Sequence, residues 1–190
     1  MNKFGNILIT GGAGYIGSHI VEKLVKTNTK IFILDNLVTG HKKLINKKAK
    51  FIKGDIKDLT KVRNIIIKND IKSIIHLAAH LNVKEAEKYK KKYNLNNIKG
   101  TFKLIKACKN LKIKNIIFSS SCSIYGNVNG SVSEKRKPNP QGYYAYTKYK
   151  GEQLIKKYSK KYKYKYAILR YFNVAGASDS NKIGEIQKSY

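Results

Sequence analysis

Short apolar runs recur along the chain and alternate with longer segments in which apolar residues follow a helical spacing. Most of the runs are continuous and rich in β-branched residues, as in strands that are buried on both faces of a sheet. The predicted strands cover residues 6–10, 30–35, 50–52, 73–79, 114–121 and 166–172.

The intervening segments have apolar residues three and four positions apart, which predicts amphipathic helices. One carries Ile16, Ile20 and Leu24, and another Val62 and Ile65. A long helix is predicted from about residue 83 to 110, and a further one over residues 144–162. Regular alternation of strand and helix predicts an α/β fold, a Rossmann-type doubly wound parallel sheet with helices on both faces.

The composition is that of a globular protein, and a chain of 190 residues with 42% hydrophobic residues can bury one sizeable core. It has no apolar run of membrane-spanning length, and its start lacks the features of a signal peptide, so we predict a cytoplasmic location. The two cysteines, Cys108 and Cys122, are too few for a disulfide framework and are expected to be reduced thiols.

The formal net charge of +29 raises the question of nucleic-acid binding. Nearly all of the positive charge is lysine scattered along the chain, with only three arginines, whereas base-reading proteins favour arginine for bidentate contacts. We therefore expect weak, salt-sensitive adhesion to polyanions and no specific nucleic-acid partner.

The first predicted strand runs directly into "TGGAGYIGSH", which fits a glycine-rich phosphate loop through Gly11, Gly14 and Gly17. Such glycines allow a tight turn and a close approach of the backbone to a pyrophosphate, which the following helix N-terminus stabilises. The motif is weak alone, but here it follows a strand and opens a helix, as a dinucleotide site requires.

The second predicted strand ends at Asp35, about twenty residues after the glycines, where an acid accepts hydrogen bonds from the adenosine ribose. A carboxylate there repels a 2′-phosphate, which favours NAD over NADP. The third strand is followed by Asp55, which the spacing places equally well beside the adenine or at the cap of the next helix.

Three consecutive serines end the fifth predicted strand, and Tyr144 and Lys148 follow at helical spacing. A lysine ammonium beside a phenol is expected to lower the tyrosine pKa, so that Tyr144 can exchange a proton with a sugar hydroxyl held by Ser121. Tyr146 and Lys150 match the same spacing, and the residues alone do not separate the two pairs.

The chain resembles the extended short-chain dehydrogenase/reductase family in motifs that come in the family's order and spacing. They are "TGGAGYIGSH", "DNLVTGH", "GDI", "IHLAA", "NNIKGT", "FSSSCSIYG", "YYAYTKYKGE" and "LRYFNVAGA". The family pattern around the active helix fits Tyr144, Thr147, Lys148 and Glu152, and so selects Tyr144 as the base. The resemblance implies an NAD-binding domain over residues 1–173 and, in residues 174–190, the start of a substrate-binding segment that is otherwise missing.

The resemblance also implies roles for individual residues. The cofactor-binding set is Gly11, Gly14, Tyr15, Ile16, Gly17, Asp35, Asn36, Asp55, Ile56, Leu77, Ala78, Ala79, Asn96, Tyr144, Lys148 and Phe172. The catalytic residues are Ser121, Tyr144 and Lys148, and the substrate contacts are Ser121, Tyr144 and Asn173. Two long helices, about 83–110 and 144–162, are expected to pack against a second subunit in a homodimer.

Within this family the chain is most similar to NAD-dependent sugar-nucleotide epimerases, which interconvert UDP-glucose and UDP-galactose through a 4-keto intermediate. Related dehydratases and decarboxylases need an acid just after the active serine or threonine, and here the run is Ser121-Cys122-Ser123. The alternatives are an epimerase of another UDP-sugar and an NAD-binding remnant without catalysis.

Two histidines at i, i+4, His76 and His80, have a spacing that binds metals on helices. His76 falls on a predicted strand and no third ligand is evident, so a packed histidine beside the cofactor is the preferred interpretation. No metal site is predicted.

Overall fold

A computed structural model describes residues 4–186 of the chain. Six strands form one sheet in the order β3-β2-β1-β4-β5-β6, and every pairing is parallel. The strands are β1 (Asn6–Thr10), β2 (Ile31–Asp35), β3 (Lys50–Lys53), β4 (Ile71–His76), β5 (Asn115–Ser121) and β6 (Lys165–Tyr171). The predicted α/β class with a parallel sheet is confirmed.

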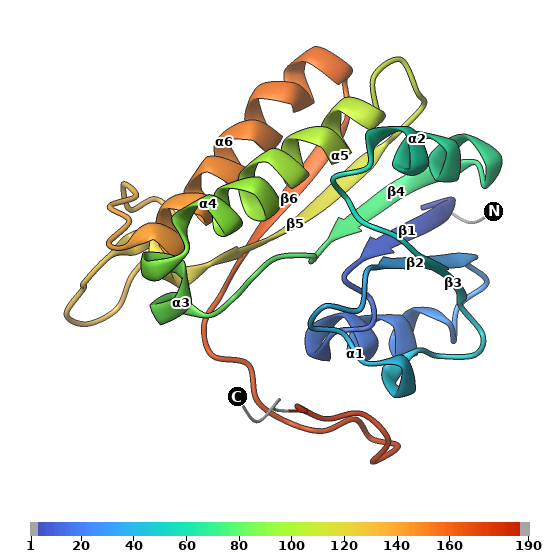
Figure 1. Cartoon of the computed structure of the whole chain (residues 1–190), viewed down its shortest axis with the longest axis horizontal. Helices are drawn as coiled ribbons and strands as arrows, with labels where there is room; N and C mark the ends of the chain where they lie inside the picture. Colours follow the sequence, from blue (N-terminus) through green and yellow to red (C-terminus); the bar gives the residue numbers. More distant parts are fainter. Residues whose placement is uncertain (1–3, 187–190) are drawn as a thin grey trace.

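The sheet separates two apolar cores because successive strand residues point to opposite faces. In β2, Phe32 and Leu34 face one core, and Ile31 and Ile33 face the other. Helix α1 (Tyr15–Leu24) covers the Ile33 side, and α2 (Leu59–Lys68), α5 (Thr101–Ala107) and α6 (Tyr143–Tyr162) cover the Leu34 side (Figure 1).

The strand order reverses between β1 and β4, which pair side by side at the centre of the sheet. From β1 the chain builds outward through β2 to β3, and from β4 outward through β5 to β6. A crevice forms at the carboxyl ends of the strands at such a switch point, and ligands of open α/β sheets bind there. The topology thus places the ends of β1, β2, β4 and β5 around one site.

The long helix predicted over residues 83–110 is wrong as a single element. The segment consists of α3 (Val83–Lys88), α4 (Lys90–Tyr93), a π-helix η2 (Asn94–Gly100) and α5. Tyr89 separates α3 from α4, because its φ of −118° and ψ of 52° are not helical. The wider π turns place the side chains of Asn96 and Asn97 in the interior, and Gly100 lets η2 approach Ile56 closely. π turns inside helices are rare and often mark functional sites.

Strand β4 ends at His76, three residues before the end predicted from its apolar run. The amide of Leu77 still donates to the carbonyl of Thr10, at 3.0 Å, and the chain then turns away from the sheet. Ala78 and Ala79 therefore belong to the edge of the crevice and not to the strand.

Two short 3₁₀ helices, η1 (Lys42–Leu44) and η3 (Cys122–Tyr125), complete the elements. Of the helices formed by residues 4–186, none is both long enough and apolar enough to cross a membrane.

Candidate nucleotide cleft and catalytic centre

The turn after β1 depends on its glycines. Gly11 has φ +75°, and a Cβ there would lie 2.7 Å from the amide nitrogen of Ala78. A Cβ on Gly17 would lie only 2.2 Å from the carbonyl oxygen of Gly11. Gly14 caps α1 without a side-chain acceptor, so the first amides of this ten-residue helix are available to an anion. The loop therefore has the shape and the donors that a pyrophosphate requires.

Asp35, at the end of β2, ties the strand to this loop. Its buried carboxylate accepts hydrogen bonds from the amides of Ala13, at 3.0 Å, and Leu37, at 2.8 Å. A carboxylate has about four lone-pair positions, so the remaining ones can accept the hydroxyls of a ribose.

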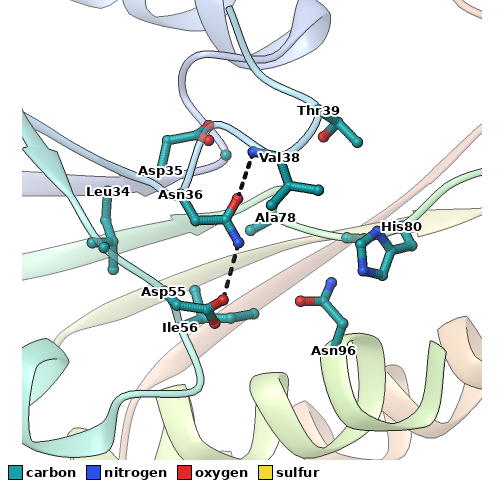
Figure 2. Close-up of a pocket in the computed structure, with 13 residues that line it drawn as sticks. Leu34, Asp35, Asn36, Val38, Thr39, Asp55, Ile56, Ala78, His80 and Asn96 are labelled. Carbon is teal, nitrogen blue, oxygen red and sulfur yellow. Dashed lines mark hydrogen bonds between the residues drawn. The ribbon is translucent and has the colours of Figure 1, made fainter. Parts of the chain in front are cut away.

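Asn36 lies between Val38 and Asp55 and joins the ends of β2 and β3 (Figure 2). Its amide donates to Asp55 Oδ2 at 3.0 Å, and its carbonyl accepts from the Val38 amide at 3.0 Å. Partial burial raises the pKa of Asp55, but hydrogen bonds from the Lys57 amide and from Asn36 outweigh it, and the pKa is lowered overall. Asp55 is therefore ionised at neutral pH.

The cap of α2 is Asp58, whose carboxylate accepts from the Lys61 amide at 2.9 Å. Asp55 is therefore not the cap that the sequence left open, and it lines the cleft instead.

A cleft at this sheet edge collects the residues of both sides of the switch point. Its lining consists of Gly11, Leu34, Asp35, Asn36, Val38, Thr39, Gly54, Asp55, Ile56, Ala78, Ala79, His80 and Asn96. Figure 2 shows His80 and Asn96 across the opening from Leu34 and Asp35. Eight of the predicted cofactor residues lie here: Gly11, Asp35, Asn36, Asp55, Ile56, Ala78, Ala79 and Asn96.

The predicted cofactor set left out five lining residues: Leu34, Val38, Thr39, Gly54 and His80. Each directly adjoins a recognised motif. Val38 and Thr39 lie in the "DNLVTGH" loop, and His80 follows "IHLAA". Proximity to those motifs was the signal that could have found them.

Other predicted residues lie outside the lining of this cleft. Gly14 and Tyr15 line an adjacent cavity, and Leu77 packs in the core under α1. Ile16 and Gly17 stand on the first turn of α1. Phe172 is 65% exposed just after β6, and Asn173 is also exposed. The structure therefore does not bring Phe172 or Asn173 to the cleft.

His76 is a core residue at the base of the site. Its ring nitrogens lie 2.7 Å from Thr10 Oγ1 and 2.9 Å from Thr101 Oγ1. Burial, together with the positive charge of Lys148, lowers the pKa of His76 to about 3, so the ring is neutral. Within residues 4–186, no group of three or more His, Cys, Asp or Glu side chains could hold a metal ion. His76 is a packed histidine, as interpreted from the sequence.

Lys148 is almost entirely buried beneath the site. Its Nζ donates to the carbonyl of Ser119 at 2.9 Å, and lies 5.6 Å from the ring centre of Phe118 and 5.9 Å from that of Tyr144. Burial lowers the pKa of Lys148 to about 8. The ammonium form still predominates at neutral pH, and it lies between the end of β5 and the tyrosine.

Tyr144 is buried on the first turn of α6, and burial raises its pKa. A hydrogen bond with Ser121 acts in the opposite direction. The predicted lowering of the Tyr144 pKa is wrong, because desolvation of the buried phenol is the largest effect and raises the pKa overall.

Ser121 ends β5 and caps η3, where its Oγ accepts from the amide of Ser123 at 3.2 Å and from the Ser123 hydroxyl at 2.9 Å. The competing pair lies on the surface instead, with Tyr146 39% exposed and Lys150 stacked over its ring at 5.5 Å. The structure thus brings Ser121, Tyr144 and Lys148 together.

Asn97, from the π-helix, links the cleft to α6. Its amide donates to the His80 carbonyl at 3.0 Å and to Thr147 Oγ1 at 3.2 Å, and its oxygen accepts from the His80 amide at 2.9 Å. Thr147 lies between Tyr144 and Lys148 on α6, so the wall of the cleft and α6 are held in one buried network.

Comparison with known proteins places this arrangement in a family. The profile of the NAD dependent epimerase/dehydratase family matches residues 7–188. A UDP-glucose 4-epimerase of Lactobacillus helveticus is 42% identical over 94% of this chain and 54% of its own length. A putative UDP-glucose 4-epimerase of Methanocaldococcus jannaschii is 42% identical over 93% of this chain and 58% of its own.

A solved structure has the same fold. It is the UDP-glucose 4-epimerase from Brucella ovis in complex with NAD, with a TM-score of 0.92 and 35% sequence identity, over 98% of this chain and 58% of that one. The chain thus spans about half the length of the relatives it matches. With its glycine loop, its buried tyrosine and lysine and this similarity, the chain belongs to the NAD dependent epimerase/dehydratase family.

Proposed function

We propose that this chain is the nucleotide-binding and catalytic part of an NAD-dependent epimerase that interconverts UDP-glucose and UDP-galactose. The observation that carries the proposal is the buried grouping of Ser121, Tyr144 and Lys148 at the sheet edge that also forms the nucleotide cleft. The relatives named above as UDP-glucose 4-epimerases support the same reaction.

The cleft fits NAD in its shape and donors. The turn of Gly11, Gly14 and Gly17 leaves room and free amides for the pyrophosphate, with Tyr15 and Ile16 alongside. Asp35 and Asn36 would hold the adenosine ribose, and Asp55 and Ile56 the adenine. On the other side of the cleft lie Ala78, Ala79 and Asn96. Leu77, Phe172, Tyr144 and Lys148 lie outside the lining of this cleft and are proposed to contact the rest of the cofactor.

NAD held by these residues would supply the acceptor for the hydride that leaves C4 of the sugar and, once reduced, the donor that returns it. Tyr144 removes the C4-hydroxyl proton and later restores it, acting as base and then as acid. Its pKa is raised by burial, so the hydrogen bond from Ser121 is needed to favour the phenolate, and the charged Lys148 stabilises it as it forms. Ser121 also holds the reacting hydroxyl.

Asn173 is proposed to reach the diphosphate of the sugar nucleotide. The chain spans about half the length of its relatives. An epimerase of another UDP-sugar and an NAD-binding remnant without catalysis are the outcomes against which the proposal is tested.

We also propose a homodimer formed through α3–α5 and α6. The exposed side chains of Tyr89, Leu95 and Tyr146 on these helices, 46%, 39% and 39% exposed, support an interface there. Light scattering of the wild type and of Tyr146→Glu tests it, since the variant should be monomeric. A cytoplasmic location is proposed as well, in keeping with two free cysteines.

The test uses the full chain of 190 residues. Calorimetry with NAD and with NADP measures cofactor binding, and anion-exchange chromatography follows conversion of UDP-galactose, UDP-N-acetylgalactosamine and UDP-glucuronic acid. Tyr144→Phe is the matched control because it removes only the hydroxyl of the base.

Tight binding of NAD with conversion of UDP-galactose, abolished in Tyr144→Phe, is the expected result. Conversion of only another sugar would replace the substrate. Binding of NAD in wild type and Tyr144→Phe without conversion of any sugar would establish the remnant, and preference for NADP would contradict the role of Asp35.

A further inference from the structure

Glu152 is a carboxylate with no solvent exposure inside helix α6. An isolated charge in such a place costs several kcal/mol, so it must be paired and hydrogen-bonded. Its oxygens accept from Arg170 Nε at 3.0 Å and Arg170 Nη2 at 2.9 Å, and Oε1 also accepts from Ser120 Oγ at 2.6 Å. The contact with Arg170 is bidentate, which fixes direction as well as distance.

Arg170, on β6, also donates hydrogen bonds to a second part of the chain through its third guanidinium nitrogen, Nη1. Its Nη1 donates to the hydroxyl of Tyr125 at 2.8 Å and to the carbonyl of Glu134 at 3.1 Å. The guanidinium also stacks over the Tyr125 ring, 4.8 Å from its centre. One side chain therefore joins β6, α6, η3 and the loop after η3.

Each anchor adjoins a residue of the reaction. Glu152 stands one helical turn after Lys148, on the same face of α6. Ser120 immediately precedes Ser121 in β5, and η3, which holds Tyr125, begins directly after Ser121. Within residues 4–186, neither side chain of the pair makes a hydrogen bond or ion pair with the side chain of Tyr144, Ser121 or Lys148.

A buried ion pair is weak evidence for stability, because apolar residues of the same volume often serve as well. Orientation is what such a pair supplies and an apolar pair does not. We propose that Glu152 and Arg170 are positioning residues that fix the end of β5 against α6, so that Ser121, Tyr144 and Lys148 meet in reactive geometry. The inference rests on the proposed function for its role in catalysis.

Arg170→Lys is the primary test, because it keeps the positive charge and loses the bidentate contact with Glu152. The matched control is Tyr164→Phe, which removes a buried hydrogen bond of 2.9 Å from Tyr164, the residue just before β6, to the Ile155 carbonyl of α6. This bond lies at the opposite end of β6 from Arg170 and from the site. Urea unfolding and NAD affinity are measured for both variants, with kcat and KM. The pKa of Lys148 is also measured by NMR titration, which does not depend on enzymatic activity. The Lys148 signal is assigned as the one that is absent from Lys148→Met.

If the pair positions the site, Arg170→Lys lowers kcat about tenfold or more with KM and NAD affinity nearly unchanged, corresponding to about 1.4 kcal/mol of barrier. Its Lys148 also titrates about one unit or more above the wild-type value of about 8, because water reaches a loosened site. Tyr164→Phe loses stability and leaves both properties as in wild type.

The proposal is overturned if Lys148 titrates as in wild type in Arg170→Lys, or if kcat falls only in proportion to stability, as in the control. Should Arg170→Lys fail to fold, the isosteric Glu152→Gln takes its place with the same expectations. If the wild type proves inactive, the proposed function fails on its own assay, and the titration alone decides the positioning role.

Discussion

The two halves of the sheet edge are built by different means. The nucleotide half, on β1, β2 and β3, is shaped by backbone, with tight glycine contacts at Gly11 and Gly17 and the carboxylates of Asp35 and Asp55 beyond them. The half that we propose to be catalytic, called the catalytic half below, lies on β4, β5 and α6 and is shaped by buried polar side chains such as His76, Lys148 and Glu152. The first should respond to added volume and the second to added or removed charge.

This difference also separates binding from stability. A loop held by its backbone loses its ligand when it is distorted, while the fold around it persists. A buried charge imposes a cost on the folded state itself, which the neighbouring groups must offset. The following predictions test that separation, starting with the largest expected effect.

Acid should lower the free energy of unfolding mainly through the catalytic half, because His76 is buried there as a neutral ring. The folded pKa of His76 is about 3, against 6.5 in the unfolded chain, so the unfolded state binds the extra proton. Stability present above pH 6.5 is therefore lost as the pH falls toward 3, by about 4 to 5 kcal/mol from this group. Urea unfolding of wild type and His76→Asn across this range checks it. An equally steep decline in the variant would locate the acid sensitivity elsewhere.

Added volume should damage the nucleotide half without a pH signature. Gly17→Ala places a methyl group 2.2 Å from the Gly11 oxygen, so the loop must open. We expect NAD affinity to fall about 100-fold, or about 2.7 kcal/mol. Calorimetry at pH 6 and pH 8 measures it. Gly184→Ala is the control, because a Cβ there meets no heavy atom of the described residues within 4 Å. Affinity within threefold of wild type, about 0.7 kcal/mol, would contradict the backbone account.

Removing a buried charge should stabilise the catalytic half while abolishing its chemistry. The folded pKa of Lys148 is about 8, against 10.5 unfolded, so its charge opposes folding below pH 8 and the cost disappears as the pH rises past 10.5. After allowance for the lost bond to Ser119, Lys148→Met should be about 2 kcal/mol more stable at pH 7, with less gain at pH 10. The surface variant Lys150→Met should change little, and a less stable Lys148→Met would refute the argument.

Two aspartates three residues apart should separate binding from stability inside the nucleotide half. Asp58→Ala removes the cap of α2 and should cost about 1 kcal/mol of stability with NAD affinity unchanged. Asp55→Ala should weaken NAD binding instead, because Asp55 lines the cleft. Thermal unfolding and calorimetry with NAD are measured on both variants. Weakened NAD binding in Asp58→Ala would contradict the assignment of Asp58 to stability alone.

The sequence predicted the nucleotide half better than the catalytic half for a physical reason. Gly11, Gly14, Gly17 and Asp35 act through local turns and short loops, so their spacing along the chain carries the geometry. The fold class followed from the alternation of strands and helices, which is also a local signal. The site residues stay predictions until ligand binding is measured.

The failures came from tertiary contacts. The π-helix at Asn94–Gly100 has ordinary helical spacing in sequence, and only its packing against Ile56 and α6 reveals the wider turns. The raised pKa of Tyr144 depends first on burial, which a spacing of four residues does not reveal. The pair of Glu152 and Arg170 joins two elements that composition and periodicity do not connect.

Strand β6 comes after the other described strands along the chain, and this has a consequence for folding during synthesis on the ribosome. All residues that line the nucleotide cleft have been synthesised once the ribosome has added Asn96. Glu152, in contrast, has no guanidinium partner until Arg170 has been synthesised. We therefore expect a nascent chain to complete its nucleotide cleft first and to keep Glu152 hydrated until the last strand docks. Docking of β6 is then the step that commits the growing polypeptide to a catalytic centre.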